Sequence, residues 1–255
     1  DIHQYPPSKF AFHESDLILM LGARLDNQMN FGNPPLFPET TKLVCINASH
    51  EEIEFNRAAD INLLCDIGAF CDSLIKLKNS QKWNLKEEWF HLNKDKRAKR
   101  VESSILRLSK DTEVEKANDE KIHPLQLALD VQEIMEDNDW LVIDGGNTHF
   151  WSEIAINIAG AKGKKLGGIL HPGTFSMLGV GVSFALSAKN NNPNSNVILI
   201  SGDGAFLSGG MSIEAAFFEN KPIVVVIDNN GGLASIGQQQ ERLFESGKRV
   251  ATDFR

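Results

Sequence analysis

Short runs of consecutive apolar residues, each followed by a glycine or a polar turn, recur along the chain. Such runs predict strands that are buried on both faces of a parallel sheet. In the first part of the chain the predicted strands cover residues 15–21, 43–47 and 62–65, and a short amphipathic helix begins at residue 70 and extends to 77. The alternation of apolar strands with a helix predicts an α/β fold for this segment.

Residues 79–121 have a different composition, in which charged residues crowd together behind a few large apolar side chains. A solvated helix with one apolar face accounts for this pattern, and the charges need no ligand to explain them. We therefore expect a first domain over residues 1–78, a charged helical linker over 79–121 and a second domain over 122–255.

The strand-and-helix pattern is sharper in the second domain. The apolar runs there predict strands over residues 140–143, 197–201 and 223–228, with helices over 178–189 and 212–218. The whole chain is thus predicted to hold parallel sheets flanked by helices. In such folds ligands bind at the carboxyl ends of the strands.

Composition narrows the choice of partners. The chain has 255 residues, is 42% hydrophobic and carries a formal net charge of −8, which disfavours nucleic acid and anionic membranes as partners. It holds no apolar run of about 18 residues, the length that a membrane span needs. It also opens with polar residues that do not resemble a signal peptide. We therefore expect a cytoplasmic protein that acts on small molecules.

Three glycine-rich polar segments follow the three predicted strands of the second domain. They read DGGNT (144–148), GDGA (202–205) and DNNGG (228–232). Because parallel strands end at one edge of their sheet, the three segments should converge there. Their convergence predicts a single ligand site.

Oxygen-bearing side chains in two of these segments suit a divalent cation. A carboxylate from Asp203 and a carboxamide from Asn230 would supply two hard ligands, and a backbone carbonyl in the next glycine turn a third. Phosphate oxygens and a water would complete an octahedron suited to Mg²⁺. Gly204 would allow a tight turn, so that amides at the next helix face a phosphate. Taken alone, Gly-Asp-Gly is more typical of a simple turn than of a cation site.

The full spacing resembles the signature of thiamine diphosphate (ThDP) enzymes: Gly-Asp-Gly, then 24 residues (Ala205 to Asp228), then Asn-Asn. This resemblance implies that Asp203, Asn230 and the carbonyl of Gly232 bind Mg²⁺. The 144–148 segment resembles the diphosphate cradle of acetolactate synthase-like members. The implied cofactor contacts are Gly145, Gly146, Asn147, Thr148, Gly202, Asp203, Gly204, Ala205, Asn230, Gly232 and Leu233.

Residues 173–181 (GTFSMLGVG) resemble the family segment that folds the cofactor. Leu178 falls where an apolar side chain wedges beneath the thiazolium, and Ser176 where a backbone carbonyl accepts a bond from the 4′-amino group. The resemblance thus gives both residues catalytic roles as well as cofactor contacts. Without it, Leu178 would be expected in the core. His149 and His171 flank this predicted site and could touch the substrate.

The first domain resembles part of the middle domain of the acetolactate synthase and 2-hydroxyacyl-CoA lyase branches. The matching motifs are GARLD (22–26) and FGNPP (31–35). Several members bind FAD or ADP in this domain. Asn47 and Ser49 stand where acidic residues are usual, which argues against a ribose contact here.

The resemblance implies a ThDP- and Mg²⁺-dependent enzyme that makes or breaks a C–C bond next to a carbonyl. Acetolactate synthase-like carboligation of 2-keto acids is the first expectation, with 2-hydroxyacyl-CoA lyase or oxalyl-CoA decarboxylase as alternatives. The family's pyrimidine-binding domain, with its activating glutamate, has no match here. We expect it from a missing N-terminal region or another chain, and we expect a homo-oligomer. The resemblance also implies that the second domain ends before the last part of the family's diphosphate domain, so a non-catalytic cofactor-binding fragment or subunit stays open.

Overall fold

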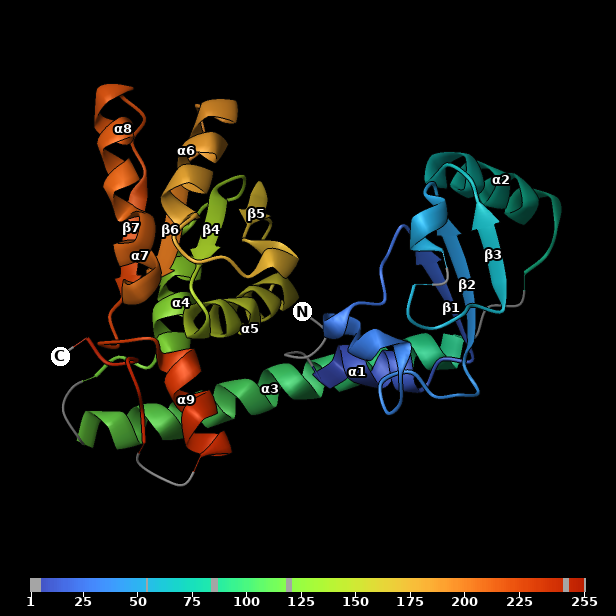
Figure 1. Ribbon diagram of the computed structural model, residues 1–255, viewed down its shortest axis with the longest axis horizontal. Helices are drawn as coiled ribbons and strands as arrows, with labels where there is room; N and C mark the ends of the chain where they lie inside the picture. Colours follow the sequence, from blue (N-terminus) through green and yellow to red (C-terminus); the bar gives the residue numbers. More distant parts are fainter. Residues whose placement is uncertain (1–5, 54, 84–86, 118–120, 245–247, 255) are drawn as a thin grey trace. The chain divides into compact units, whose positions relative to one another are not determined.

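The computed structural model describes residues 6–53, 55–83, 87–117, 121–244 and 248–254. The chain divides into two compact units, Asp1–Arg100 and Val101–Arg255. A long helix, α3 (Glu87–Ala117), runs across the division and contains most of the charged segment. Figure 1 shows the elements of each unit. No helix among the described residues combines the length and apolar character that crossing a membrane requires.

The first unit is built on a three-stranded parallel sheet in the order β1-β2-β3. Its strands are β1 (Leu17–Leu21), β2 (Lys42–Asn47) and β3 (Ile61–Leu64), and its helices are α1 (Pro6–His13) and α2 (Ile67–Ser80), with short turns η1 (Asn27–Gly32) and η2 (His50–Glu52). One side of the sheet packs on a core that includes Phe37 and Leu43. These strands confirm the predicted α/β pattern, and α1 is an addition to it.

Arg57 holds the long loop between β1 and β2 in place. Its guanidinium donates to the carbonyls of Gly32 at 3.0 Å and Thr41 at 2.9 Å, and to others between them. A planar group with several donors can satisfy many loop carbonyls at once, which a lysine cannot do. The proline-rich loop is therefore fixed by one side chain.

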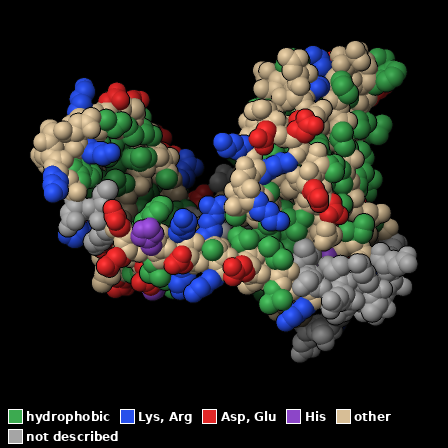
Figure 2. Space-filling view, turned by 180° about the vertical axis from the view of Figure 1, so that it is seen from behind, with side chains coloured by type: hydrophobic (Ala, Val, Ile, Leu, Met, Phe, Trp, Pro, Cys, Tyr) green, Lys and Arg blue, Asp and Glu red, His purple; other side chains and the backbone are tan. Residues whose placement is uncertain are grey.

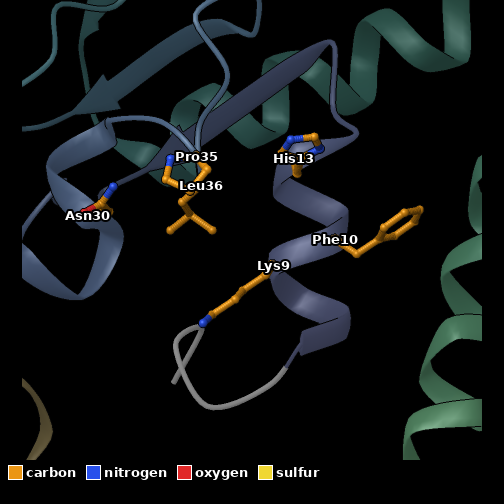
Figure 3. Close-up of a pocket in the computed structure, with 6 residues that line it drawn as sticks. All are labelled: Lys9, Phe10, His13, Asn30, Pro35 and Leu36. Carbon is orange, nitrogen blue, oxygen red and sulfur yellow. The ribbon is translucent and has the colours of Figure 1, made fainter. Parts of the chain in front are cut away.

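A cavity of about 410 Å³ lies beside this loop. Figure 3 shows Lys9 and His13 of α1 on one side of it and Asn30, Pro35 and Leu36 on the other. The cavity is separate from the position of Asn47, whose side chain accepts the Ser49 amide at 3.1 Å. An FAD or ADP site in this unit stays an untested expectation.

The second unit holds a four-stranded sheet in the order β5-β4-β6-β7, and every pairing is parallel. Its strands are β4 (Trp140–Asp144), β5 (Gly168–Leu170), β6 (Val197–Gly202) and β7 (Val224–Asp228). Its helices and turns are α4 (Pro124–Ile134), α5 (Asn147–Ala161), η3 (Gly173–Phe175), α6 (Gly181–Asn191), α7 (Asp203–Gly209), η4 (Gly210–Ser212), α8 (Ile213–Phe218) and α9 (Ala234–Leu243).

Helices cover both faces of this sheet (Figure 1). On one face α4 and α5 pack against Leu141, Ile143 and Ile200. On the other, α6 packs against Val142 and Leu199, with α7 and α8 alongside. Alternate residues of each central strand thus enter opposite cores, which explains the unbroken apolar runs 140–143 and 197–200.

Two boundaries differ from those expected from the sequence. The helix expected from residue 178 begins at Gly181, because Ser176 (φ 49°) and Gly179 (φ +88°) are left-handed and interrupt it. The DGGNT and GDGA segments are junctions rather than loops. Asn147 is already the first residue of α5, and Asp203 the first residue of α7.

Candidate functional site

The carboxyl ends of the three predicted strands meet at one edge of the sheet. Asp144 at the end of β4 lies opposite Ser201 of β6. Gly202, the last residue of β6, lies opposite Asp228 at the end of β7. The convergence predicted for the three glycine-rich segments is therefore confirmed.

Glycines let these strand ends approach closely. A Cβ on Gly145 would lie 3.1 Å from the backbone nitrogen of Gly202, and Gly145 has φ +126°. A side chain at Gly145 would therefore be strained and would separate β4 from β6. The start of α5 is thereby kept beside the start of α7.

Asp203 ties the end of β6 to the glycine turn after β7. One carboxylate oxygen accepts the amides of Gly231 at 2.8 Å and Gly232 at 3.1 Å. The other accepts the Gly204 amide at 2.8 Å. These bonds bring the predicted ligands Asp203 and Gly232 together, with the exposed Asn230 next in the chain to Gly231. They also engage the Gly204 amide, in the first turn of α7.

Thr148 links the first and third segments. Its hydroxyl donates to the Asp228 carboxylate at 2.9 Å, across the end of β6. Burial raises the pKa of Asp228, the Thr148 bond opposes that rise, and the negative charge of Asp203 adds to it. The edge therefore holds two neighbouring carboxylates, an arrangement that a cation would relieve.

Asp144 performs a structural task that the sequence did not reveal. Its buried carboxylate accepts the amide of Gly181 at 2.7 Å and that of Gly179 at 3.0 Å. Burial raises the pKa of Asp144, while the bonds from these backbone amides lower it. The side chain thus fixes the glycine-rich segment before α6 to the end of β4.

The segment that carries Ser176 and Leu178 is exposed in this structure. The exposed fraction is 39% for Leu178, 58% for Met177 and 89% for Phe175. The expectation that Leu178 is an ordinary core residue is therefore wrong, because the left-handed turn at Ser176 carries it out of the core. Figure 2 shows further hydrophobic side chains on this unit towards α8, where Phe217 and Phe218 are largely exposed.

Leu233 lies against Gly204 rather than in the open edge. A Cβ on Gly204 would come within 2.7 Å of the Leu233 side chain and 3.1 Å of Phe254. The segment ending at Phe254 is held there, because Leu233 donates its amide to Thr252 at 2.7 Å and Gly231 accepts that of Phe254 at 2.9 Å. The glycine turn is thus held by Asp203 and also by the backbone of Thr252 and Phe254.

The predicted ligand set fits Mg²⁺ by its chemistry. Asp203 retains lone pairs beyond the three amide bonds, since an ionised carboxylate has about four acceptor positions. It combines with one carboxamide and one carbonyl, all oxygen donors of the kind that Mg²⁺ prefers. Nowhere in the described ranges do three His, Cys, Asp or Glu side chains form a metal cluster. A cation at this edge would have to use such a mixed set.

Comparison with known families matches both units. The model for "Thiamine pyrophosphate enzyme, C-terminal TPP binding domain" matches residues 144–254. The model for "Thiamine pyrophosphate enzyme, central domain" matches residues 1–74. The first match begins at Asp144 and includes all three segments at the edge of the sheet.

The sequence identity of this chain to individual curated proteins is low. The chain is 27% identical to 2-hydroxyacyl-CoA lyase 1 of Mus musculus over 229 residues, 88% of this chain and 37% of that protein. It is 26% identical to 2-hydroxyacyl-CoA lyase 2 of Homo sapiens, over 90% of this chain and 35% of that protein. It is 27% identical to a probable acetolactate synthase of Mycobacterium bovis, over 87% of this chain and 37% of that protein. The chain thus spans less than two fifths of the length of these relatives.

Proposed function

Because the chain belongs to the thiamine pyrophosphate enzymes, we propose that its second unit binds the diphosphate of ThDP through Mg²⁺. The observation that carries this proposal is the position of Asp203. Its carboxylate lies at the end of β6 and is bonded to the glycine turn that contains the other two proposed ligands. Asp203, Asn230 and the Gly232 carbonyl would hold the ion.

The diphosphate itself would lie at the amino end of α5. Gly146 precedes this helix and places no side-chain cap on its first amides, and the first amides of a long helix favour an anion. Thr148 is bonded to Asp228, so its hydroxyl is oriented rather than free. Asn147 is the side chain in this first turn that would reach a terminal phosphate oxygen.

Ser176 and Leu178 would shape the bound cofactor. Leu178 is held at the surface by the bonds that Asp144 makes to Gly179 and Gly181. An apolar side chain kept exposed by such bonds is suited to packing beneath a ring. Leu178 would support the thiazolium, and the Ser176 carbonyl would accept a bond from the 4′-amino group.

The proposed reaction is the formation or cleavage of a C–C bond next to a carbonyl. When bound, ThDP supplies the nucleophilic carbon and the electron sink for such chemistry. The chain's own residues anchor the diphosphate, orient the rings and exclude water on one side. Carboligation of 2-keto acids is the first candidate, and cleavage of a 2-hydroxyacyl-CoA is the second, favoured by the names of two of the relatives above.

A pyrimidine-binding domain would complete the site. The exposed apolar side chains around Leu178 and α8 support this part of the proposal, since a large exposed apolar patch marks an interaction surface. The domain would come from another region of the protein or from a second copy in a homo-oligomer.

An assay of the complete enzyme with ThDP and Mg²⁺ tests the reaction. Pyruvate consumption with formation of acetolactate would support carboligation, and cleavage of a 2-hydroxyacyl-CoA to an aldehyde and formyl-CoA would support the lyase reaction. Loss of either activity in Asp203→Ala, with activity kept in Asp130→Ala on the exposed face of α4, would assign it to this site. Activity that needs neither ThDP nor Mg²⁺ would refute the proposal.

A further inference from the structure

Two histidines meet beside the proposed site. His171 directly follows β5, whose Leu170 lies opposite Val142 of β4. His171 is therefore next to the strand end that carries Asp144. His149 lies in the first turn of α5, immediately after Thr148. The two rings pack edge to face, with centroids 4.9 Å apart.

The backbone fixes which nitrogen of His171 bears the proton. The Gly173 amide donates to Nδ1 of His171 at 3.1 Å. A nitrogen that accepts a hydrogen bond is deprotonated, so the proton of the neutral ring is on Nε2. Pro172 restricts His171 to extended backbone angles, which further limits the positions of the ring. His171 thus has one oriented donor, Nε2–H.

The surroundings of His171 favour the neutral ring. Although His171 is exposed, neighbouring protein partly desolvates its ring, which lowers its pKa below the ordinary value of 6.5, and the neighbouring His149 lowers it further. Glu153 has the opposite effect on this pKa, but its carboxylate is bonded to Nε2 of His149 at 2.9 Å. Among the described residues, His149 and Glu153 are the titratable groups that act on His171, and both come from α5.

We propose that His171 donates its Nε2–H to the carbonyl oxygen of the substrate, and that His149 and Glu153 position it. This inference rests on the proposed function, because it assumes a carbonyl substrate on ThDP at this edge. From His171 the chain runs through η3 directly to Ser176 and Leu178, the residues proposed to hold the reacting rings. A neutral imidazole can stabilise negative charge that develops on an oxygen without transferring its proton.

A metal site is the other reading of two histidines and a glutamate. The bond of Nε2 of His149 to Glu153 and the engagement of Nδ1 of His171 by Gly173 leave the three groups without a shared centre. In agreement, the described part of the chain has no such metal cluster. The hydrogen-bond role is the one that the geometry supports.

The first test is nuclear magnetic resonance of the full chain with ¹⁵N-labelled histidine, between pH 5 and 8. We expect His171 in the Nε2–H form with a pKa below 6.5. His149→Phe, which keeps an aromatic edge but removes the neighbouring charge, should raise that pKa. An Nδ1–H form, or a pKa of 6.5 or above, would overturn the proposal without reference to any cofactor.

The second test is turnover of the complete enzyme with ThDP, Mg²⁺ and either pyruvate or a 2-hydroxyacyl-CoA. His171→Asn keeps an acceptor for the Gly173 amide but lacks a donor at the Nε2 position. It should lower kcat by about 100-fold, as removal of an oxyanion donor does, with KM and ThDP affinity unchanged. His171→Gln, whose amide reaches the Nε2 position, should restore part of the rate, and the exposed His50→Gln is the control.

The outcomes separate the two proposals. A wild-type enzyme that binds ThDP and turns over, but whose His171→Asn variant equals His50→Gln, would refute the role of His171 alone. A wild-type enzyme that binds no ThDP, or acts on neither substrate, would refute the proposed function and this role with it.

Discussion

Replacing Asp144 tests how the segment that carries Ser176 and Leu178 (residues 173–181) is held in place. Asp144→Ala would leave the amides of Gly179 and Gly181 without their acceptor. The buried Gly181 donor costs about 1–3 kcal/mol, and the part-buried Gly179 donor costs less, so the expected local loss is about 2–4 kcal/mol. Asp144→Asn should cost less than about 1.5 kcal/mol, because a single oxygen, Oδ2, accepts both of these amides and Asn can present an oxygen there.

The sign of the pH dependence follows from the buried carboxyl group. The pKa of Asp144 in the folded chain is raised above its ordinary value of 3.8. Because this pKa is raised, the stability that Asp144 contributes through its proton is full below pH 3.8. It declines as the pH rises through the pKa of Asp144 in the folded chain. Asp144→Asn lacks this contribution, so it should become more stable relative to the wild type as the pH rises from 3 to 7.

Hydrogen–deuterium exchange at residues 179–185 is the suitable assay, because a chain with two units need not unfold in one step. Asp144→Ala should lose protection there, whereas Asp130→Ala, an exposed aspartate on α4, should stay within about 0.5 kcal/mol of wild type. Equal effects of Asp144→Ala and Asp130→Ala would refute the anchoring role. A loss in Asp144→Asn as large as in Asp144→Ala would refute the hydrogen-bond reasoning.

Three further substitutions test the role of Leu178, the bond between Thr148 and Asp228, and the loop contacts of Arg57. Leu178→Ala should destabilise the chain by less than the 2–5 kcal/mol typical of a buried leucine, since its side chain is partly exposed. Turnover should fall while Mg²⁺ binding stays intact, and unchanged turnover would exclude the role of Leu178 beneath the thiazolium. Thr148→Val removes one hydrogen bond worth about 1 kcal/mol and should raise the pKa of Asp228, measured by carboxyl-carbon resonance titration; an unchanged pKa would contradict the assignment. Arg57→Lys should lower the free energy of unfolding of the first unit by about 2–4 kcal/mol through lost loop bonds, measured in urea; no change would mean that the loop is held otherwise.

The sequence revealed the strands and their converging ends because both rest on local composition. The strand Val197–Gly202 opens with four consecutive apolar residues, and its glycine-rich end is unambiguous. Asp203 could be singled out because its spacing to Asn230 resembles the signature of ThDP enzymes, and both residues follow predicted strands. These are properties of short segments, which a single sequence displays directly.

The parts that could not be predicted depend on contacts between distant residues. β5 has only three residues, and a Cβ on Gly168 would clash with Trp140 of the next strand. α5 was missed because its first turn falls within a glycine-rich motif. The bonds from Asp144 to Gly179 and Gly181 join residues more than 30 positions apart, as their separations of 35 and 37 show. No local sequence pattern predicts hydrogen bonds between residues so far apart in the chain.

Isothermal titration of ThDP into the protein, with and without Mg²⁺, measures the proposed cofactor site itself. We expect binding that requires Mg²⁺, that is abolished in Asp203→Ala and that is weakened in Asn230→Ala. The second variant removes an exposed side chain and leaves the bonds of Asp203 to Gly231 and Gly232 in place, so its effect reports the ion rather than the turn. Unchanged ThDP affinity in Asp203→Ala, with circular dichroism equal to wild type, would contradict the assignment of this site.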